Sequence, residues 1–247
     1  MAVKNEKIGA EYRKELKKEL LKMAEFLRNN CSDICANPDS LHTAANSLND
    51  RAGADYLSWR YHLVELGFRA TTPKNSLPSS LPKILDVILD ISAEGVAKNA
   101  AHDPFTKLEV NIQLKAVING NEHLDTWHLD RHITNGNIPN EIHPLYHIQR
   151  GGHRMSGLKN NIGSTMILEP PRISHPPLDA ILGIDYVLSH YLGSKWQELR
   201  EDDEYEKLIN DAQLRLWSGG AWTWAKHWTQ PAGISVKNSL KLSPSLY

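Results

Sequence analysis

The chain has few cysteines, no excess of charge of either sign and no long hydrophobic run. Only Cys31 and Cys35 are present among 247 residues, too few for a disulfide scaffold or a structural zinc site. With 28 basic and 29 acidic residues, the formal charge is −1, so no overall field attracts nucleic acid or a membrane surface. No apolar run reaches the roughly 18 residues of a transmembrane helix, and the N-terminus lacks the apolar core of a signal peptide. We therefore expect a protein of the reducing cytoplasm with no membrane partner.

The first 100 residues carry a pattern that predicts helices. Apolar side chains at steps of three and four predict an amphipathic helix over residues 6–29, and Asp39-Ser40 suits the start of a second helix. A similar pattern predicts a third helix between Gly53 and Gly67. Pro82 suits the first turn of a fourth helix over about residues 82–98.

After Pro104 the apolar period changes from that of a helix to that of a strand. Apolar and polar residues alternate over 107–115, and Asn119-Gly120 then predicts a two-residue hairpin turn. In that hairpin the numbers of paired residues sum to 239, which sets Ile112 opposite Trp127. Apolar residues then face apolar residues across the pair, which supports this register.

Two more strands and further helices complete the predicted fold. The strands are expected over about 144–150 and 164–169, and the helices over about 177–192 and 203–217, the last breaking at Gly219-Gly220 and then continuing.

The predicted fold class is α+β, in a single domain of residues 1–247. An antiparallel meander of about four strands, roughly residues 106–169, carries helices on its apolar face. The helices come from the N-terminal part, residues 1–100, and from residues 176–229, while the sheet region spans 104–170.

Histidine and aspartate recur on one face of the predicted hairpin. His128, Asp130 and His132 are two residues apart, so on a strand they point to the same side. If Tyr146 and Ile148 lie on the apolar face of the sheet, His147 lies on the polar face, together with His128, Asp130 and His132. This shared polar surface predicts acid–base chemistry or a metal site.

Three interpretations of this polar face remain open. It can be an ordinary solvent-facing surface. It can cleave a phosphodiester without metal, with His128 and His147 exchanging protons and Asp130 orienting them. His132 would then stabilise phosphate charge together with Lys107 or Arg172. It can also hold a divalent metal through His128, Asp130 and either His147 or His132. No cofactor is expected unless the metal interpretation holds.

Four further residues are candidate substrate contacts. Lys107 shares the polar face, Arg154 lies in the glycine-rich 151–157 segment, and Arg172 and His175 lie in a proline-rich stretch. The 151–157 segment is not a phosphate loop, because it lacks the Lys-Ser/Thr ending and the following helix. For Arg172, an ion pair with Asp185 is the structural alternative to substrate binding.

The leading hypothesis is a small cytoplasmic hydrolase acting on RNA or a nucleotide, in the manner of a bacterial toxin or an antiphage protein. The first alternative is a non-enzymatic component that binds a protein partner through its C-terminal tryptophans and the sheet face. Core packing also explains the spacing of Trp217, Trp224 and Trp228. The second alternative is a metal-dependent enzyme.

Overall fold

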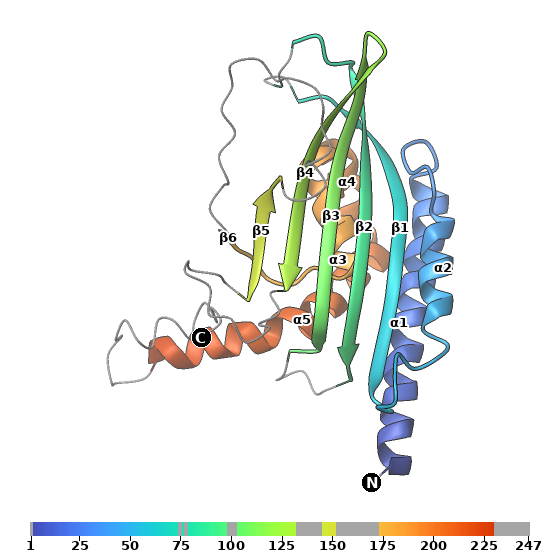
Figure 1. The fold of residues 1–247 in the computed structure, drawn as a ribbon, viewed down its shortest axis with the longest axis vertical. Helices are drawn as coiled ribbons and strands as arrows, with labels where there is room; N and C mark the ends of the chain where they lie inside the picture. Colours follow the sequence, from blue (N-terminus) through green and yellow to red (C-terminus); the bar gives the residue numbers. More distant parts are fainter. Residues whose placement is uncertain are drawn as a thin grey trace.

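The fold is known from a computed structural model, which describes residues 2–73, 76, 79–97, 103–131, 145–151 and 173–229. It confirms an α+β fold with an antiparallel sheet in chain order (Figure 1). Within the described ranges the sheet has six strands: β1 (Ser58–Thr71), β2 (Ile84–Val96), β3 (Phe105–Ile118), β4 (Asn121–Arg131), β5 (Tyr146–Arg150) and β6 (Ile173–Ser174). The strand expected at 164–169 lies outside the described residues.

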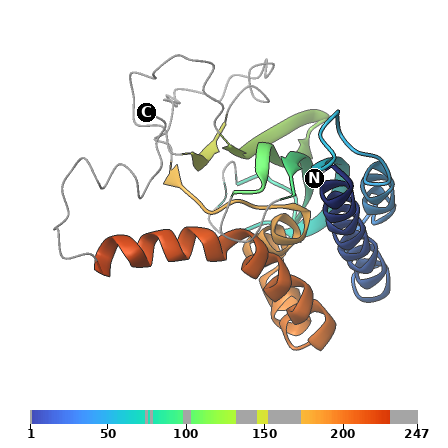
Figure 2. The same ribbon diagram turned by 90° about the horizontal axis from the view of Figure 1, so that it is seen from below.

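The helices gather on one side of the sheet and along its β1 edge, as Figures 1 and 2 show together. They are α1 (Ala2–Asn30), α2 (Asp39–Ser47), α3 (Ala180–Tyr191), α4 (Gly193–Arg200) and α5 (Asp203–Thr229). Helix α3 approaches the sheet at Gly183, where an added Cβ would lie 3.0 Å from the Ile91 side chain. The absence of a side chain at this position therefore lets the helix lie close to β2. None of the described helices combines the length and the apolar composition needed to span a bilayer.

The prediction of a helix between Gly53 and Gly67 is wrong, because this stretch belongs largely to β1. Trp59, Tyr61 and Leu63 alternate into the core as a strand requires. The pairing with β2 then shifts between Leu63 and Leu66, at a bulge where Glu65 has a φ of 54°. The helix had been predicted from the spacing of Tyr56, Trp59, His62 and Leu63. Trp59 and Leu63 are four residues apart, a spacing that places both side chains on one face in a strand as well as in a helix.

The helix predicted over 82–98 is also wrong, since residues 84–96 form β2. Its buried side chains are Leu85, Val87, Leu89 and Ile91, at a strict period of two. Ile84 and Ile88 point to the other face, so that the strand reads as an almost continuous apolar run. Such a run does not distinguish a strand from a buried helix by period alone.

The predicted hairpin of β3 and β4 is confirmed in its register. Ile118 pairs with Asn121 and Ile112 with Trp127, as the sum of 239 requires. Asn119 and Gly120 have φ values of 52° and 79°, which fit the left-handed pair of a type I′ turn.

The C-terminal helices differ from the prediction in two ways. Helix α4 was not expected, and α5 runs without a break through Gly219-Gly220. The three helices meet at Asp185, whose carboxylate accepts hydrogen bonds from Trp196 Nε1, Tyr205 Oη and Arg200 Nη2. Among the described residues, the ion-pair partner of Asp185 is thus Arg200. Arg172, for which an ion pair with Asp185 was the alternative to substrate binding, lies outside the described residues.

Candidate functional site

The pairing of β4 with β5 brings the predicted site residues together. Asp130 lies directly opposite His147, and His128 lies directly opposite Gln149. Tyr146 and Ile148 point to the other face, which is the condition under which His147 was expected to join the polar face. We call the surface with His128, Asp130 and His147 the polar face.

Three possible metal ligands meet on the polar face. His128, Asp130 and His147 each offer one ligand atom, and these atoms all lie within 4.8 Å of one another. Nε2 of His128 is 3.6 Å from Oδ2 of Asp130, and the two imidazole rings are 6.3 Å apart at an angle of 83°. The rings therefore stand edge to face and both reach the space beside the carboxylate.

The three side chains differ in exposure from one to the next. His147 is buried, at 3% exposed, while the side chains of His128 and Asp130 are 14% and 36% exposed. The group thus has one rigid, desolvated member and one open side, where the Asp130 carboxylate is accessible to solvent. An ion held there would keep an approach for water or substrate.

A backbone carbonyl sets the tautomer of His128. Nδ1 of His128 lies 3.2 Å from the carbonyl oxygen of Gly151, at the end of β5. Because a carbonyl oxygen only accepts, the proton of the neutral ring resides on Nδ1. The lone pair of Nε2 then faces Asp130 and is available to a metal or a proton, in the arrangement that metal-binding histidines usually show.

The same glycine ties the two strands together next to the site. The Gly151 carbonyl also accepts from Thr126 Oγ1 at 2.8 Å, and the Gly151 N–H donates to the Thr126 carbonyl at 2.7 Å. In the sequence, Gly151 is only the first residue of a glycine-rich segment. Its role was not predictable because it depends on the β4–β5 register.

The polar face carries negative charge around these ligands. Register places Glu109 opposite Asp130, and Asp90 opposite Asn111 in the next row. Lys107, the candidate phosphate contact on this face, lies 3.3 Å from Glu109 and forms an ion pair with it. The positive charge of Lys107 is therefore largely neutralised by its own strand.

His175 does not join this group. Ser174 pairs with His147, so that the next residue points to the opposite side of the sheet. There its imidazole packs 5.7 Å from the ring of Tyr186 of α3, and burial lowers its pKa. His175 was predicted as a candidate substrate contact, and the structure places it beside Tyr186 rather than with His128, Asp130 and His147.

Three other candidates lie outside the described residues: His132, Arg154 and Arg172. The tryptophans of the C-terminal helix are described only in part. Trp217 donates its indole N–H to the Pro177 carbonyl at 2.9 Å and packs against the core, as the core-packing alternative requires.

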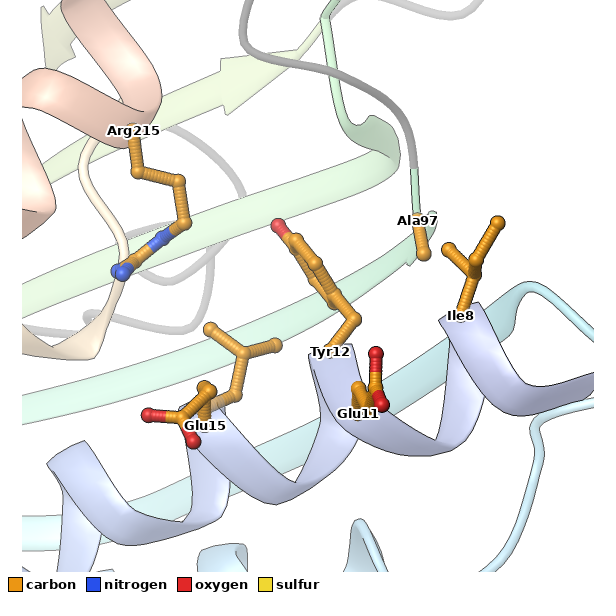
Figure 3. A pocket seen from close by; sticks show the side chains of 7 residues that line it. Ile8, Glu11, Tyr12, Glu15, Ala97 and Arg215 are labelled. Carbon is orange, nitrogen blue, oxygen red and sulfur yellow. The ribbon is translucent and has the colours of Figure 1, made fainter.

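A pocket elsewhere in the described structure has different chemistry. It has a volume of about 250 Å³ and lies between α1 and α5, with Ile8, Tyr12 and Ala97 among its lining residues. Figure 3 shows the Tyr12 side chain reaching from α1 toward the Arg215 side chain of α5, whose guanidinium is turned away from the Tyr12 ring. The Arg215 guanidinium is already paired with Glu19 and Asp179, so it is not a free cation for an anionic ligand in this pocket.

The chain matches no protein-family model, and comparisons with curated proteins and with solved structures also found no match. No relative therefore supplies a function, and the chemistry of the site has to come from its own residues.

Proposed function

We propose that the protein is a hydrolase that cleaves a phosphodiester, in RNA or a nucleotide, with a divalent metal ion bound by His128, Asp130 and His147. The observation that carries the proposal is the mutual approach of the three ligand atoms to within 4.8 Å. Two imidazoles and one carboxylate form a ligand set typical of zinc, iron and manganese, and they leave further coordination positions open.

The charges around the site favour the metal over metal-free proton exchange. Asp130, Glu109 and Asp90 lie in two adjacent rows of the sheet, and a phosphodiester brought to this surface would be repelled. Lys107 offsets little of this charge, because it pairs with Glu109. A divalent cation reverses the local sign, which lets an anionic substrate approach.

The tautomer of His128 supports the same choice. A ligating histidine donates its second ring N–H to a carbonyl or carboxylate, which orients the ring and raises the basicity of the ligand nitrogen. The bond from Nδ1 of His128 to Gly151 supplies this contact.

The proposed reaction adds one water molecule across a P–O ester bond. A divalent ion held by His128, Asp130 and His147 would polarise a phosphoryl oxygen and would lower the pKa of a water molecule at the site, so that the water oxygen could attack phosphorus. The ester P–O bond breaks, and the proton lost by the water ends on the leaving oxygen. The proposal includes a cytoplasmic location, which the two free, buried thiols of Cys31 and Cys35 favour.

Metal binding and hydrolysis should be measured together. Titration calorimetry with Zn²⁺ and Mn²⁺ should give one ion per chain, and bis(p-nitrophenyl) phosphate should be hydrolysed by the loaded protein. His128→Gln, Asp130→Asn and His147→Gln should each weaken metal affinity by at least about 100-fold, because each removes a ligand. His62→Gln is the matched control, since His62 lies in the same row as Glu109 and Asp130 but is exposed on β1.

The results separate the three hypotheses. Hydrolysis that survives a chelator and is lost in His147→Gln would contradict the metal and favour proton exchange between the histidines. Absence of both metal binding and hydrolysis would overturn the enzyme proposal. In that case a stable protein partner, retained by the three variants, would favour the binding component.

A further inference from the structure

The pocket between α1 and α5 combines apolar walls with an acidic edge. Four of its lining residues are apolar or aromatic: Ile8, Tyr12, Leu16 and Ala97. The others are Arg215 and two glutamates, Glu11 and Glu15. In Figure 3 the ring of Tyr12 rises from α1 between the side chains of Arg215 and Ala97. The volume of about 250 Å³ has room for about eight non-hydrogen atoms, at about 30 Å³ each.

The helix α1, which forms one wall of the pocket, is held in place on two sides. On one side, Arg13 Nη1 donates to the Tyr56 carbonyl oxygen at 3.2 Å. Gly9 lets the helix lie against the same segment, since an added Cβ would overlap that carbonyl oxygen. On the other side, Arg215 joins α5 to α1 through Glu19, at 2.7 Å. The pocket is therefore formed before a ligand enters, which lowers the cost of binding.

The inner end of the pocket has no charge to offer an anion. The Arg215 guanidinium donates to Glu19 and to Asp179, at 2.7 and 2.6 Å. Burial raises the pKa of Tyr12 to about 12, so its phenol stays uncharged at neutral pH. A ligand of this pocket therefore has an apolar part for the walls and no negative charge.

The edge of the pocket carries the negative charge of Glu11 and Glu15. The two residues are four positions apart on α1, so their side chains lie on the same face of the helix. Lys7 lies 4.0 Å from Glu11, and Lys18 lies 3.9 Å from Glu15, but all four side chains are at least 60% exposed. Such exposed pairs are weak, because water screens both charges. The two carboxylates are therefore available to a cation at the edge of the pocket.

We infer that this pocket binds an aliphatic primary amine as its ammonium ion. The hydrocarbon chain lies along Ile8, Leu16 and Ala97, where it is removed from water. The ammonium group stays at the edge near Glu11 and Glu15, so that its charge is not buried. The pocket shares no residue with the polar face, and the inference is independent of the proposed function.

The test compares hexylammonium with hexanol and hexanoate, which have the same chain and a different charge. Each is titrated into the full chain with ¹³C-labelled isoleucine methyl groups. Hexylammonium should shift the methyl signal of Ile8 and leave that of Ile84 in place. Ile84 is the matched control, because it is 57% exposed against 41% for Ile8 and lies on β2, outside the lining of the pocket. Hexanol and hexanoate should bind at least about fivefold more weakly.

The contribution of the acidic edge is measured with glutamine variants. The double variant Glu11→Gln, Glu15→Gln should weaken hexylammonium binding about fivefold and remove most of its dependence on NaCl. Both positions are exposed on α1, so the substitutions leave the packing of the core unchanged. Glu25→Gln is the control, since Glu25 is exposed on the same helix but does not line the pocket, and its affinity should equal that of the unaltered protein.

Equal binding of hexanol and hexylammonium, or an unchanged affinity in the double variant, would overturn the assignment to an amine. No shift of the Ile8 methyl signal, or an equal shift at Ile84, would overturn the pocket as a binding site.

Discussion

Arg215 is shared by two acidic side chains in the interface between α1 and α5. Its guanidinium donates to Glu19 Oε1 at 2.7 Å and to Asp179 Oδ2 at 2.6 Å. Burial raises the pKa of Glu19 to about 6, against the opposing effect of the Arg215 charge. A single cation therefore does not fully compensate two buried carboxylates.

This arrangement predicts a pH dependence of stability. Since the pKa of Glu19 is higher in the folded state than its ordinary 4.5, protonated Glu19 stabilises the fold below about pH 4.5, and this contribution is lost as the pH rises through 6. Relative to Glu19→Gln, the protein should lose about 2 kcal/mol of unfolding free energy across this interval. Urea denaturation at several pH values measures the difference.

Glu15→Gln is the control for this prediction. Glu15 lies on the same helix with its side chain 64% exposed, so its replacement should leave the pH profile unchanged. A constant difference between the protein and Glu19→Gln from pH 4 to 7 would contradict the shifted titration.

At the scale of single residues, all three residues of the candidate site were among the predicted ones, but only two of them were predictable as neighbours. His128 and Asp130 were predictable as neighbours, because they alternate on one strand whose turn is marked by Asn119-Gly120. The contact with His147 depended on the register of β5, which a long connection left undetermined.

At the scale of elements, a strand was predictable where apolar and polar residues alternate regularly. It was not predictable where a bulge interrupts the alternation or where apolar residues lie on both faces. Strand β3 alternates apolar and polar residues, and its pairing with β4 followed from the turn. Strand β1 contains a bulge between Leu63 and Leu66, and β2 is apolar on parts of both faces. The spacing of apolar residues does not distinguish a helix from a strand in either case, because the packing of the whole sheet determines which of the two forms.

The close contact between β2 and β1 at Gly95 gives a prediction for these elements. An added Cβ at Gly95 would lie 2.1 Å from the Pro104 carbonyl oxygen and 2.4 Å from the Trp59 ring. Gly95→Ala should therefore lower the unfolding free energy by about 1–3 kcal/mol, since the backbone and the indole must both move.

The matched control is Gly53→Ala, where an added Cβ meets no atom within 4 Å. Its effect should stay within about 0.5 kcal/mol. Equal midpoints in urea for the two variants would show that the indole of Trp59 is not held against β2.

At the scale of the whole molecule, the proposed metal should act as a stabilising ligand. An ion that binds only the folded chain adds about 2.7 kcal/mol at 100 times its dissociation constant. For a chain of this size we expect a rise in Tm of about 5–10 °C with Zn²⁺ or Mn²⁺. Differential scanning calorimetry measures the rise, which should vanish in His147→Gln and persist in His62→Gln.

The assembly of the sheet has a consequence for when such a centre can exist. Residues of β4 supply two of the three ligands, but the third arrives only when β5 docks in one particular alignment, closed by the reciprocal bonds of Thr126 and Gly151. A slip of one residue would turn His147 toward the helices and present hydrophobic side chains to the ion instead. Under the proposed function, the ligand set would be complete only when β5 is paired in this register, so uptake of the ion would report on the completion of this part of the sheet.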